Sequence, residues 1–379
     1  MPTAESYGLF GSVARSDNKY TSTVSVVPGE EYSYKIYYGQ SQDKVSTNIV
    51  IQDTLDGMGT FQNIYVPTIS GYTTDNKATT STGTVWYCLT PNPDFDNVDA
   101  EHGWTSEKPV GEKVYGIIVD YSKDVNGNQF VLGNGTVAKA FNVIIYEKAD
   151  AIFEEQKFNN TVVMYREEKQ NGVFTEVQPS TQTTYASIHM PVINVTLTSN
   201  PESGTADAPT EVFSEDTIIY YLNADNRETT ALSKVVITDT LPSYVTISEA
   251  DIKINGTPIK EFGGVTYTLE GNKLTVYVDK MNGVNSYKHN YAIEIPCKVN
   301  TAVPNMLITN NGQVTSFNGI DLPEDKIYNS NTTYHITAVT NPDPTGFKDT
   351  STTVFVCILC IAMAFMFNKL IFRRRKEEL

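Results

Sequence analysis

Features of an enzyme or of a disulfide-bonded domain are scarce in this sequence. It has four Cys and four His in 379 residues, and no histidine stands near a recognisable nucleophile. It has no glycine-rich phosphate loop and no His-Glu-x-x-His zinc pattern. Cys357 and Cys360 lie in an apolar run, while Cys88 and Cys297 fall in different predicted domains, so no disulfide framework is expected. We therefore expect no enzyme activity and no cofactor.

Long apolar runs are also absent, with one exception near the C-terminus. Residues 354–367 carry no charge, and the wider segment 352–372 is long enough for a helix to cross the hydrocarbon core of a bilayer. A basic block, Arg373-Arg374-Arg375-Lys376, follows directly. Because positive charge stays on the cytoplasmic side, residues 1–351 are expected outside the cell and 373–379 inside. The lipid bilayer is thus a predicted partner.

The first thirty residues lack a basic start followed by an apolar stretch, so no secretory signal is visible. An outward-facing chain needs an export route, and we expect this sequence to be the C-terminal part of a longer precursor. The formal net charge is −16, and removing the tail from Asn368 onward, which carries a net +3, leaves −19 outside. That field repels nucleic acid, which is excluded as a partner.

Helical periodicity is missing outside the C-terminal run, whereas the marks of β-strands are frequent. The sequence has 23 Tyr, with Gly and Pro scattered as turn residues. Apolar residues alternate with polar ones, as at Ile218, Tyr220 and Leu222, which indicates strands with one buried face. A barrel would show the same pattern, but short and irregularly spaced strands favour sheets packed face to face. We predict an all-β fold of two tandem immunoglobulin-like β-sandwiches, followed by one transmembrane helix.

The sequence repeats itself. Tyr34, Val50, Ile51 and the run Asp53-Thr54-Leu55 recur 186 positions later as Tyr220, Val236, Ile237 and Asp239-Thr240-Leu241. A second match, Phe158-Asn159-Asn160 with Ile308-Thr309-Asn310, lies 150 positions apart, so the first copy carries about 36 extra residues. The predicted divisions are 1–190 for the first sandwich with an insertion at about 63–112, 191–337 for the second, 338–351 for a Pro-containing stalk, 352–372 for the membrane helix and 373–379 for the basic tail.

These motifs carry a family resemblance. Glu215-Asp216 before Tyr220, then Asp239-Thr240-Leu241-Pro242, then Asn310-Asn311-Gly312-Gln313-Val314 resemble the repeat domains of Gram-positive surface proteins. That group includes isopeptide-forming fimbrial (pilin-like) and collagen-adhesin-like domains. The first copy has Asp56 where the second has Pro242. The resemblance covers about residues 7–337.

The C-terminus resembles a cell-wall sorting signal, with Asn341, Pro342, Thr345 and Gly346 ahead of the apolar run and the basic tail. The resemblance implies that a sortase cuts after Thr345 and joins it to peptidoglycan. Asp343 and Pro344 both intervene where the usual pattern has one residue. Sortase processing and a permanent membrane anchor therefore stay open as alternatives.

The resemblance also implies a Lys–Asn isopeptide bond formed beside a buried carboxylic acid. That chemistry needs an unprotonated amine, an electrophilic amide carbon and an acid whose raised pKa lets it move protons. The candidates are Lys19, Asp53 and Asn160 in the first copy. The second copy has no Lys in residues 193–199, so Asp239 and Asn310 are expected to be ordinary turn and strand residues.

One acidic stretch could hold a cation. Asp94, Asp96, Asp99 and Glu101 crowd the insertion, and alternate carboxylates can chelate Ca²⁺. The stretch lacks the glycine and terminal glutamate of an EF-hand loop, so a solvated acidic loop is the alternative.

We predict a structural, fimbrial-type stalk on the bacterial surface, anchored by its C-terminus and displaying a distal N-terminal region. The rival is an adhesin that binds an extracellular protein or glycan through the insertion, where Trp86, Tyr87 and Trp104 lie. Exposed aromatic rings there would favour the adhesin, and buried rings the stalk. A pilin polymerised by sortase would need a reactive Lys motif that the sequence does not show.

Overall fold

The computed structural model describes residues 7–55 and 57–338. Over these ranges, the predicted all-β class is confirmed: the helical elements are four 3₁₀ turns, η1 (Ala100–His102), η2 (Glu249–Asp251), η3 (Ile259–Glu261) and η4 (Glu324–Lys326). No helix within them has the length and apolarity to cross a bilayer. The predicted membrane helix 352–372, the basic tail 373–379, the sorting residues Asn341, Pro342, Thr345 and Gly346, and almost all of the predicted stalk 338–351 lie outside the described residues.

The first module, residues 8–188, consists of two facing sheets. One has the strand order β1-β3-β12-β5, and the other has β2-β15-β13-β4-β10-β8-β9 with β6, β7, β11 and β14 attached. The strands are β1 (Gly8–Arg15), β2 (Thr23–Val26), β3 (Glu31–Gln40), β4 (Ser46–Thr54), β5 (Gly59–Tyr65), β6 (Ile69–Tyr72), β7 (Ala78–Ser81), β8 (Thr84–Cys88), β9 (Trp104–Thr105), β10 (Gly116–Asp120), β11 (Val131–Leu132), β12 (Lys139–Ala149), β13 (Gln156–Gln170), β14 (Val173–Glu176) and β15 (Ser180–Ile188).

The second module, residues 193–337, has a related strand order, but its strands form three sheets instead of two. Its sheets have the orders β16-β18-β25-β21-β22, with β20 also on β25; β23-β24-β19-β27-β28, with β29 on β27; and the three-stranded β17-β30-β26. The strands are β16 (Ile193–Asn200), β17 (Thr210–Val212), β18 (Thr217–Asn226), β19 (Leu232–Thr240), β20 (Val245–Ile247), β21 (Lys253–Ile254), β22 (Thr257–Pro258), β23 (Val265–Glu270), β24 (Lys273–Met281), β25 (Asn290–Val299), β26 (Leu307–Asn310), β27 (Gly312–Phe317), β28 (Ile320–Asp321), β29 (Tyr328–Asn329) and β30 (Thr333–Thr337).

Each module has its own core between facing sheets. In the first, Ile36 of β3 and Val143 of β12 pack in the same cluster as Ile51 of β4 and Val162 of β13. The alternation read in the sequence accounts for this, because successive side chains of a strand point to opposite faces. Tyr34, Ile36 and Tyr38 are buried, whereas Lys35 and Tyr37 between them are only half-buried.

The strand register of the two modules matches position by position. Tyr34 pairs with Ile145, and Tyr220, 186 positions after Tyr34, pairs with Ile295, 150 positions after Ile145. Most of the extra length of the first module lies in one loop. Residues 89–115 join β8 to β10, whereas residues 271–272 alone join the corresponding strands β23 and β24.

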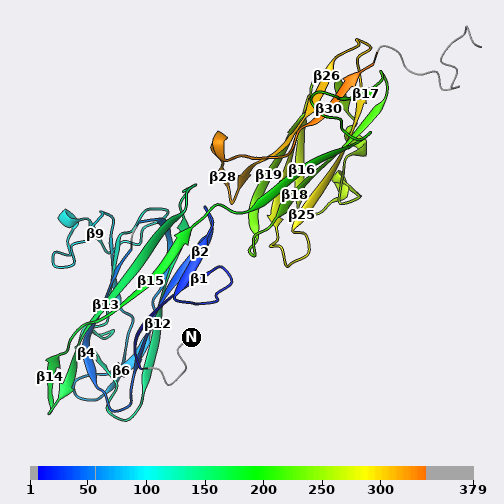
Figure 1. Ribbon diagram of the computed structural model, residues 1–379. Helices are drawn as coiled ribbons and strands as arrows, with labels where there is room; N and C mark the ends of the chain where they lie inside the picture. The colour runs from blue at the N-terminus through cyan, green and yellow to red at the C-terminus, as the bar shows by residue number, and fades with distance from the viewer. Residues whose placement is uncertain (1–6, 56, 339–379) are drawn as a thin grey trace, which may run out of the picture.

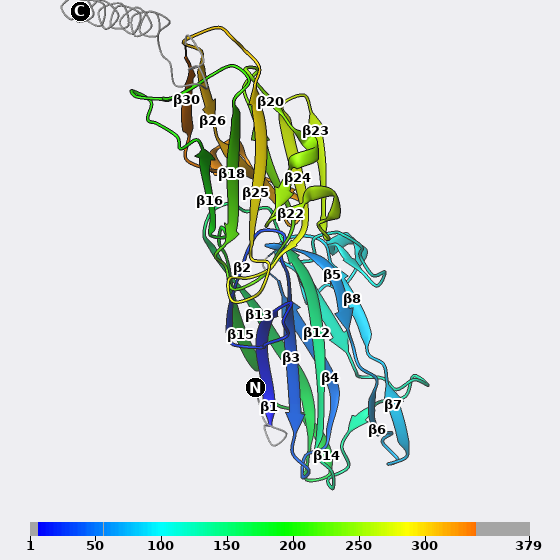
Figure 2. The same cartoon turned by 90° about the vertical axis from the view of Figure 1, so that its right-hand side faces the viewer.

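The modules lie end to end along a common long direction, with the chain entering and leaving each at opposite ends (Figures 1 and 2). Direct contacts join them. The Arg15 guanidinium donates to the Glu30 carboxylate and to Thr230 Oγ1, all at 2.6 Å. Asn318 donates to the Pro28 carbonyl at 3.0 Å, and Val27 packs in the hydrophobic core of the second module. The joint is therefore a packed interface.

Candidate functional site

The first module buries an acid beside an amide. Asp53 on β4 and Asn160 on the neighbouring strand β13 are 1% and 3% exposed. Burial raises the pKa of Asp53 to about 8, and the Asn160 side chain offsets part of that rise. Neither Asp53 oxygen has a hydrogen bond of normal geometry within the described ranges. The acid is thus held largely protonated at neutral pH, because desolvation disfavours its charged form.

The second module has the same pair, contrary to the expectation that Asp239 and Asn310 are ordinary turn and strand residues. Both are at most 2% exposed, and Asn310 Nδ2 donates to Asp239 Oδ2 at 3.1 Å. Burial raises the pKa of Asp239 to about 7. The sequence reading failed because Asp-Thr suits a turn, whereas Asp239 still belongs to β19, paired with Leu274 and Gly312. The available signal was that both copies carry Asp and Asn at matched repeat positions, the Asp residues 186 positions apart and the Asn residues 150 apart.

The predicted amine does not join this site. Lys19 lies in the loop between β1 and β2, its side chain is 83% exposed, and its ammonium lies 3.4 Å from Asp17. The structure therefore brings Asp53 and Asn160 together but leaves Lys19 outside. None of the lysines in residues 7–55 and 57–338 is buried, so neither pair has an amine within reach in this part of the chain.

Position 11 on β1 faces the strand that flanks Asn160, and position 197 on β16 is its equivalent in the second module. A Cβ added to Gly11 would be 3.0 Å from Thr184 Cγ2, and Thr184 pairs with Asn160 across β15 and β13. In the second module Leu197 takes this place, opposite Leu222, and is 1% exposed. With glycine in one copy and leucine in the other, neither position supplies an amine to the buried acid and amide.

The aromatic residues of the insertion face inward. Tyr87 and Trp104 are 4% and 3% exposed, and Trp86 is half-buried against the small cluster that Trp104 forms with Ile118. The Trp104 indole donates to the Asp94 carbonyl at 2.9 Å. Tyr87 packs in the main core of the module, against Phe61. The loop of residues 89–115 folds back over its own sheet, with Trp104 and Trp86 in the small core beneath it.

The candidate calcium ligands do not converge. Asp94 accepts from the Asp96 amide at 3.0 Å, and the Asn97 amide, which donates to it at 2.8 Å, holds the pKa of Asp94 below its usual value. Asp99 caps η1, and Glu101 is exposed. No group of three or more His, Cys, Asp or Glu suited to a metal occurs in the part of the chain that the structure describes. The carboxylates of Asp94 and Asp99 thus stabilise turns of the loop.

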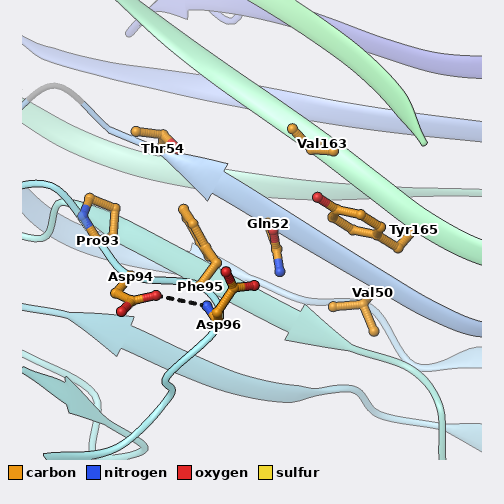
Figure 3. A pocket seen from close by; sticks show the side chains of 9 residues that line it. All are labelled: Val50, Gln52, Thr54, Pro93, Asp94, Phe95, Asp96, Val163 and Tyr165. Atoms are coloured by element: carbon orange, nitrogen blue, oxygen red, sulfur yellow. Dashed lines mark hydrogen bonds between the residues drawn. The ribbon is translucent and has the colours of Figure 1, made fainter. Parts of the chain in front are cut away.

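The loop also walls an open groove of about 620 Å³ on the outer face of β4 and β13 (Figure 3). Val50, Gln52 and Thr54 come from β4, Val163 and Tyr165 from β13, and Pro93, Asp94, Phe95 and Asp96 from the loop.

No protein-family model and no curated protein matches this chain. Among solved structures, it is similar to the C-terminal domain of the Streptococcus agalactiae AgI/II polypeptide BspA, at 13% identity over 87% of this chain and 100% of that one, with a TM-score of 0.39. It is also similar to BcpA, the major pilin subunit of Bacillus cereus, at 15% identity over 73% and 69% of the two chains, with a TM-score of 0.30. At such scores no function is transferred from either protein.

Proposed function

We propose that this protein is a structural stalk of the bacterial surface, built from tandem immunoglobulin-like sandwiches and anchored through its C-terminus. The observation that carries the proposal is the direction of the terminal strands. In each module the chain enters at one end and leaves at the other (Figure 2). A pull on the two ends of the chain would therefore act along the strands.

Near the chain ends of the first module, β2 pairs in parallel with β15 from Thr23–Tyr185 to Val26–Ile188. Tension draws such a pair apart lengthwise, so its hydrogen bonds are loaded together instead of one after another. β1 is pulled along its own axis against β3, to which it is paired over eight residues.

The second module repeats the arrangement with a shorter parallel pair. β17 pairs with β30 from Thr210–His335 to Val212–Thr337, and β16 pairs with β18 over eight residues. The packed joint at Arg15, Glu30 and Thr230 would pass tension from one module to the next.

The burial of Tyr87 and Trp104, with Trp86 half-buried against the Trp104 cluster, also favours the stalk over the rival adhesin. Residues 341–372 would supply the attachment, either to peptidoglycan through a sortase or to the bilayer. Intramolecular isopeptide bonds are not part of the proposal, because no lysine of residues 7–55 and 57–338 is buried beside either Asp–Asn pair.

The test is to stretch single molecules of the full chain between its termini. We expect two separate unfolding steps. At ~3.5 Å per residue they lengthen the chain by roughly 600 Å for the first module and roughly 500 Å for the second. The second module should yield at lower force, because its parallel pair is shorter. One merged step, or unfolding of both modules at forces too low to resolve, would contradict the stalk.

A further inference from the structure

The outer face of the sheet β1-β3-β12-β5 carries a row of aromatic side chains. Figure 2 looks along the side of the first module where β1, β3 and β12 run next to one another. The aromatic residues are Phe10 on β1, Tyr20 on the following loop, Tyr37 on β3, Tyr65 on β5 and Tyr146 on β12. Phe10 and Tyr37 are in contact, with ring centroids 6.0 Å apart. Tyr65 is 53% exposed, and the other four are half-buried.

Three adjoining hollows follow this face. The first, of about 330 Å³, is lined by Phe10, Tyr20 and Tyr37 and ends at Asn142. Asn142 also lines the second, of about 410 Å³, which ends at Tyr65. Tyr65 lines the third, of about 400 Å³, together with Tyr146. The shared residues place the three hollows side by side across the sheet, and together they are called the track.

The track contains a polar group that the described protein atoms leave unused. Asn142 Oδ1 is buried and accepts no hydrogen bond from any of them. A buried acceptor without a partner costs free energy, and a donor on a ligand lying in either neighbouring hollow would remove that cost.

The second module shows that the fold does not require these aromatic residues. By strand register, Phe10 corresponds to Thr196 and Tyr37 to Asn223. Tyr146 corresponds to Pro296, since Tyr146 pairs with Ser33 and Pro296 with Ile219, 186 positions after Ser33. The same framework folds with Thr, Asn and Pro at these places, so folding alone does not account for the aromatic face.

We propose that this track binds an uncharged glycan chain. Aromatic rings offer flat apolar surfaces to the C–H faces of sugar rings, and Tyr hydroxyls and the Asn142 amide can bond sugar hydroxyls. The charged residues that line the three hollows balance, Lys35 and Lys139 against Glu31 and Glu147, so a ligand of strong charge of either sign gains nothing here. An extended peptide that adds a strand binds along a sheet edge, whereas this track crosses the face of β3 and β12, which are paired on both sides. The proposal does not depend on the stalk function.

The test applies the fluorescently labelled full chain to a printed panel of neutral oligosaccharides (glucose, galactose, mannose and N-acetylhexosamine chains), beside sialylated and sulfated ones. We expect binding to at least one neutral chain. The double variant Phe10→Thr/Tyr37→Asn copies the second module, so it should fold, and we expect it to weaken binding at least about tenfold, or ~1.4 kcal/mol. The matched control is Asn223→Ala, at the position of Tyr37 in the second module, which should bind like the wild type.

Tyr65→Ala, at an exposed position, serves as a second variant in case the double variant does not fold, and it too should weaken binding. Three results would overturn the proposal: no oligosaccharide bound, binding confined to charged oligosaccharides, or wild-type binding by folded Phe10→Thr/Tyr37→Asn and by Tyr65→Ala.

Discussion

The two modules share a strand register and a buried acid–amide pair, yet they differ on their surfaces. Asp53 with Asn160 and Asp239 with Asn310 occupy equivalent strands. On the outer sheet face, Phe10, Tyr37 and Tyr146 of the first module are replaced by Thr196, Asn223 and Pro296 in the second. A loop of residues 89–115 in the first module also replaces a two-residue turn. The comparison teaches that the core arrangement is common property of the fold, whereas the face and the loop are additions. The second module, which lacks the loop and these aromatic residues, therefore serves as the reference for judging what they add to the first.

The largest expected effect comes from introducing an amine beside the buried Asp–Asn pair that both modules have. In Leu197→Lys, we expect the Lys amine to attack the Asn310 side-chain carbon and expel ammonia, with neutral Asp239 moving the protons. Lys at position 197 replaces a side chain that is already buried. In Gly11→Lys, by contrast, a new side chain must enter where its Cβ would lie only 3.0 Å from Thr184 Cγ2. The measurement is intact mass after folding, which should fall by one ammonia for Leu197→Lys and less completely for Gly11→Lys.

The control for this reaction is Leu197→Lys combined with Asp239→Ala, which should keep its full mass because the proton carrier is gone. If folded Leu197→Lys also keeps its full mass, an added amine does not react at the Asp239–Asn310 pair, and the prediction is wrong.

The next effect is a dependence of stability on pH. The pKa of Asp53 rises from 3.8 to about 8 on folding, and that of Asp239 from 3.8 to about 7. The folded protein therefore binds more protons than the unfolded chain between these values, so stability is greatest in acid and falls as pH rises. Between its unfolded and its folded pKa, each buried acid lowers the free energy of unfolding by about 1.4 kcal/mol for every pH unit. Urea unfolding from pH 4 to pH 9 should show the first module losing stability up to about pH 8 and the second only to about pH 7.

Substitution separates the two windows. Asp53→Asn should remove the pH dependence of the first module alone, and Asp239→Asn that of the second. A stability that rises with pH between 4 and 7 in the wild type would mean that the two acids are ionised in the folded protein.

A smaller effect is expected at the joint between the modules, where Gly29 of the first module packs on the second module. Gly29 has φ +73°, and a Cβ there would lie 2.7 Å from Ile320 Cδ1 and 2.9 Å from Asn318 Cβ. Gly29→Ala should cost about 1–2 kcal/mol for the left-handed backbone and should also push the modules apart. Small-angle scattering should show a more bent or more variable chain.

Gly127→Ala is the matched control for Gly29→Ala. Gly127 has φ +81° with nothing within 4 Å of the added Cβ, so it meets the backbone strain without the contact. If both variants scatter alike, the packing of Gly29 on the second module does not set the angle of the joint.

The sequence predicted the all-β class because alternating apolar residues define buried faces directly. It could not place Lys19, because distance along the chain does not say which way a loop side chain points. The burial of Asp239 could not be predicted either. Asp239-Thr240 is typical of a turn, yet in the structure both residues still belong to β19. The aromatic face could not be predicted from the sequence for a third reason. Phe10, Tyr37 and Tyr146 lie on three different strands, and only the pairing of those strands brings them to one face.

The smallest expected effect concerns the added loop itself. Asp99 Oδ1 accepts from the His102 amide at 3.0 Å and lies 2.7 Å from its ring Nδ1, capping η1. Asp99→Ala should cost about 1 kcal/mol, the usual worth of such a cap. Ser248→Ala is the control, because Ser248 begins η2 without a side-chain bond to its backbone. Because the second module folds with a two-residue turn here, the loss should stay local. Hydrogen exchange of the His102 and Gly103 amides should quicken about fivefold while the global unfolding midpoint holds. A drop in that midpoint would instead make the loop part of the framework that both modules share.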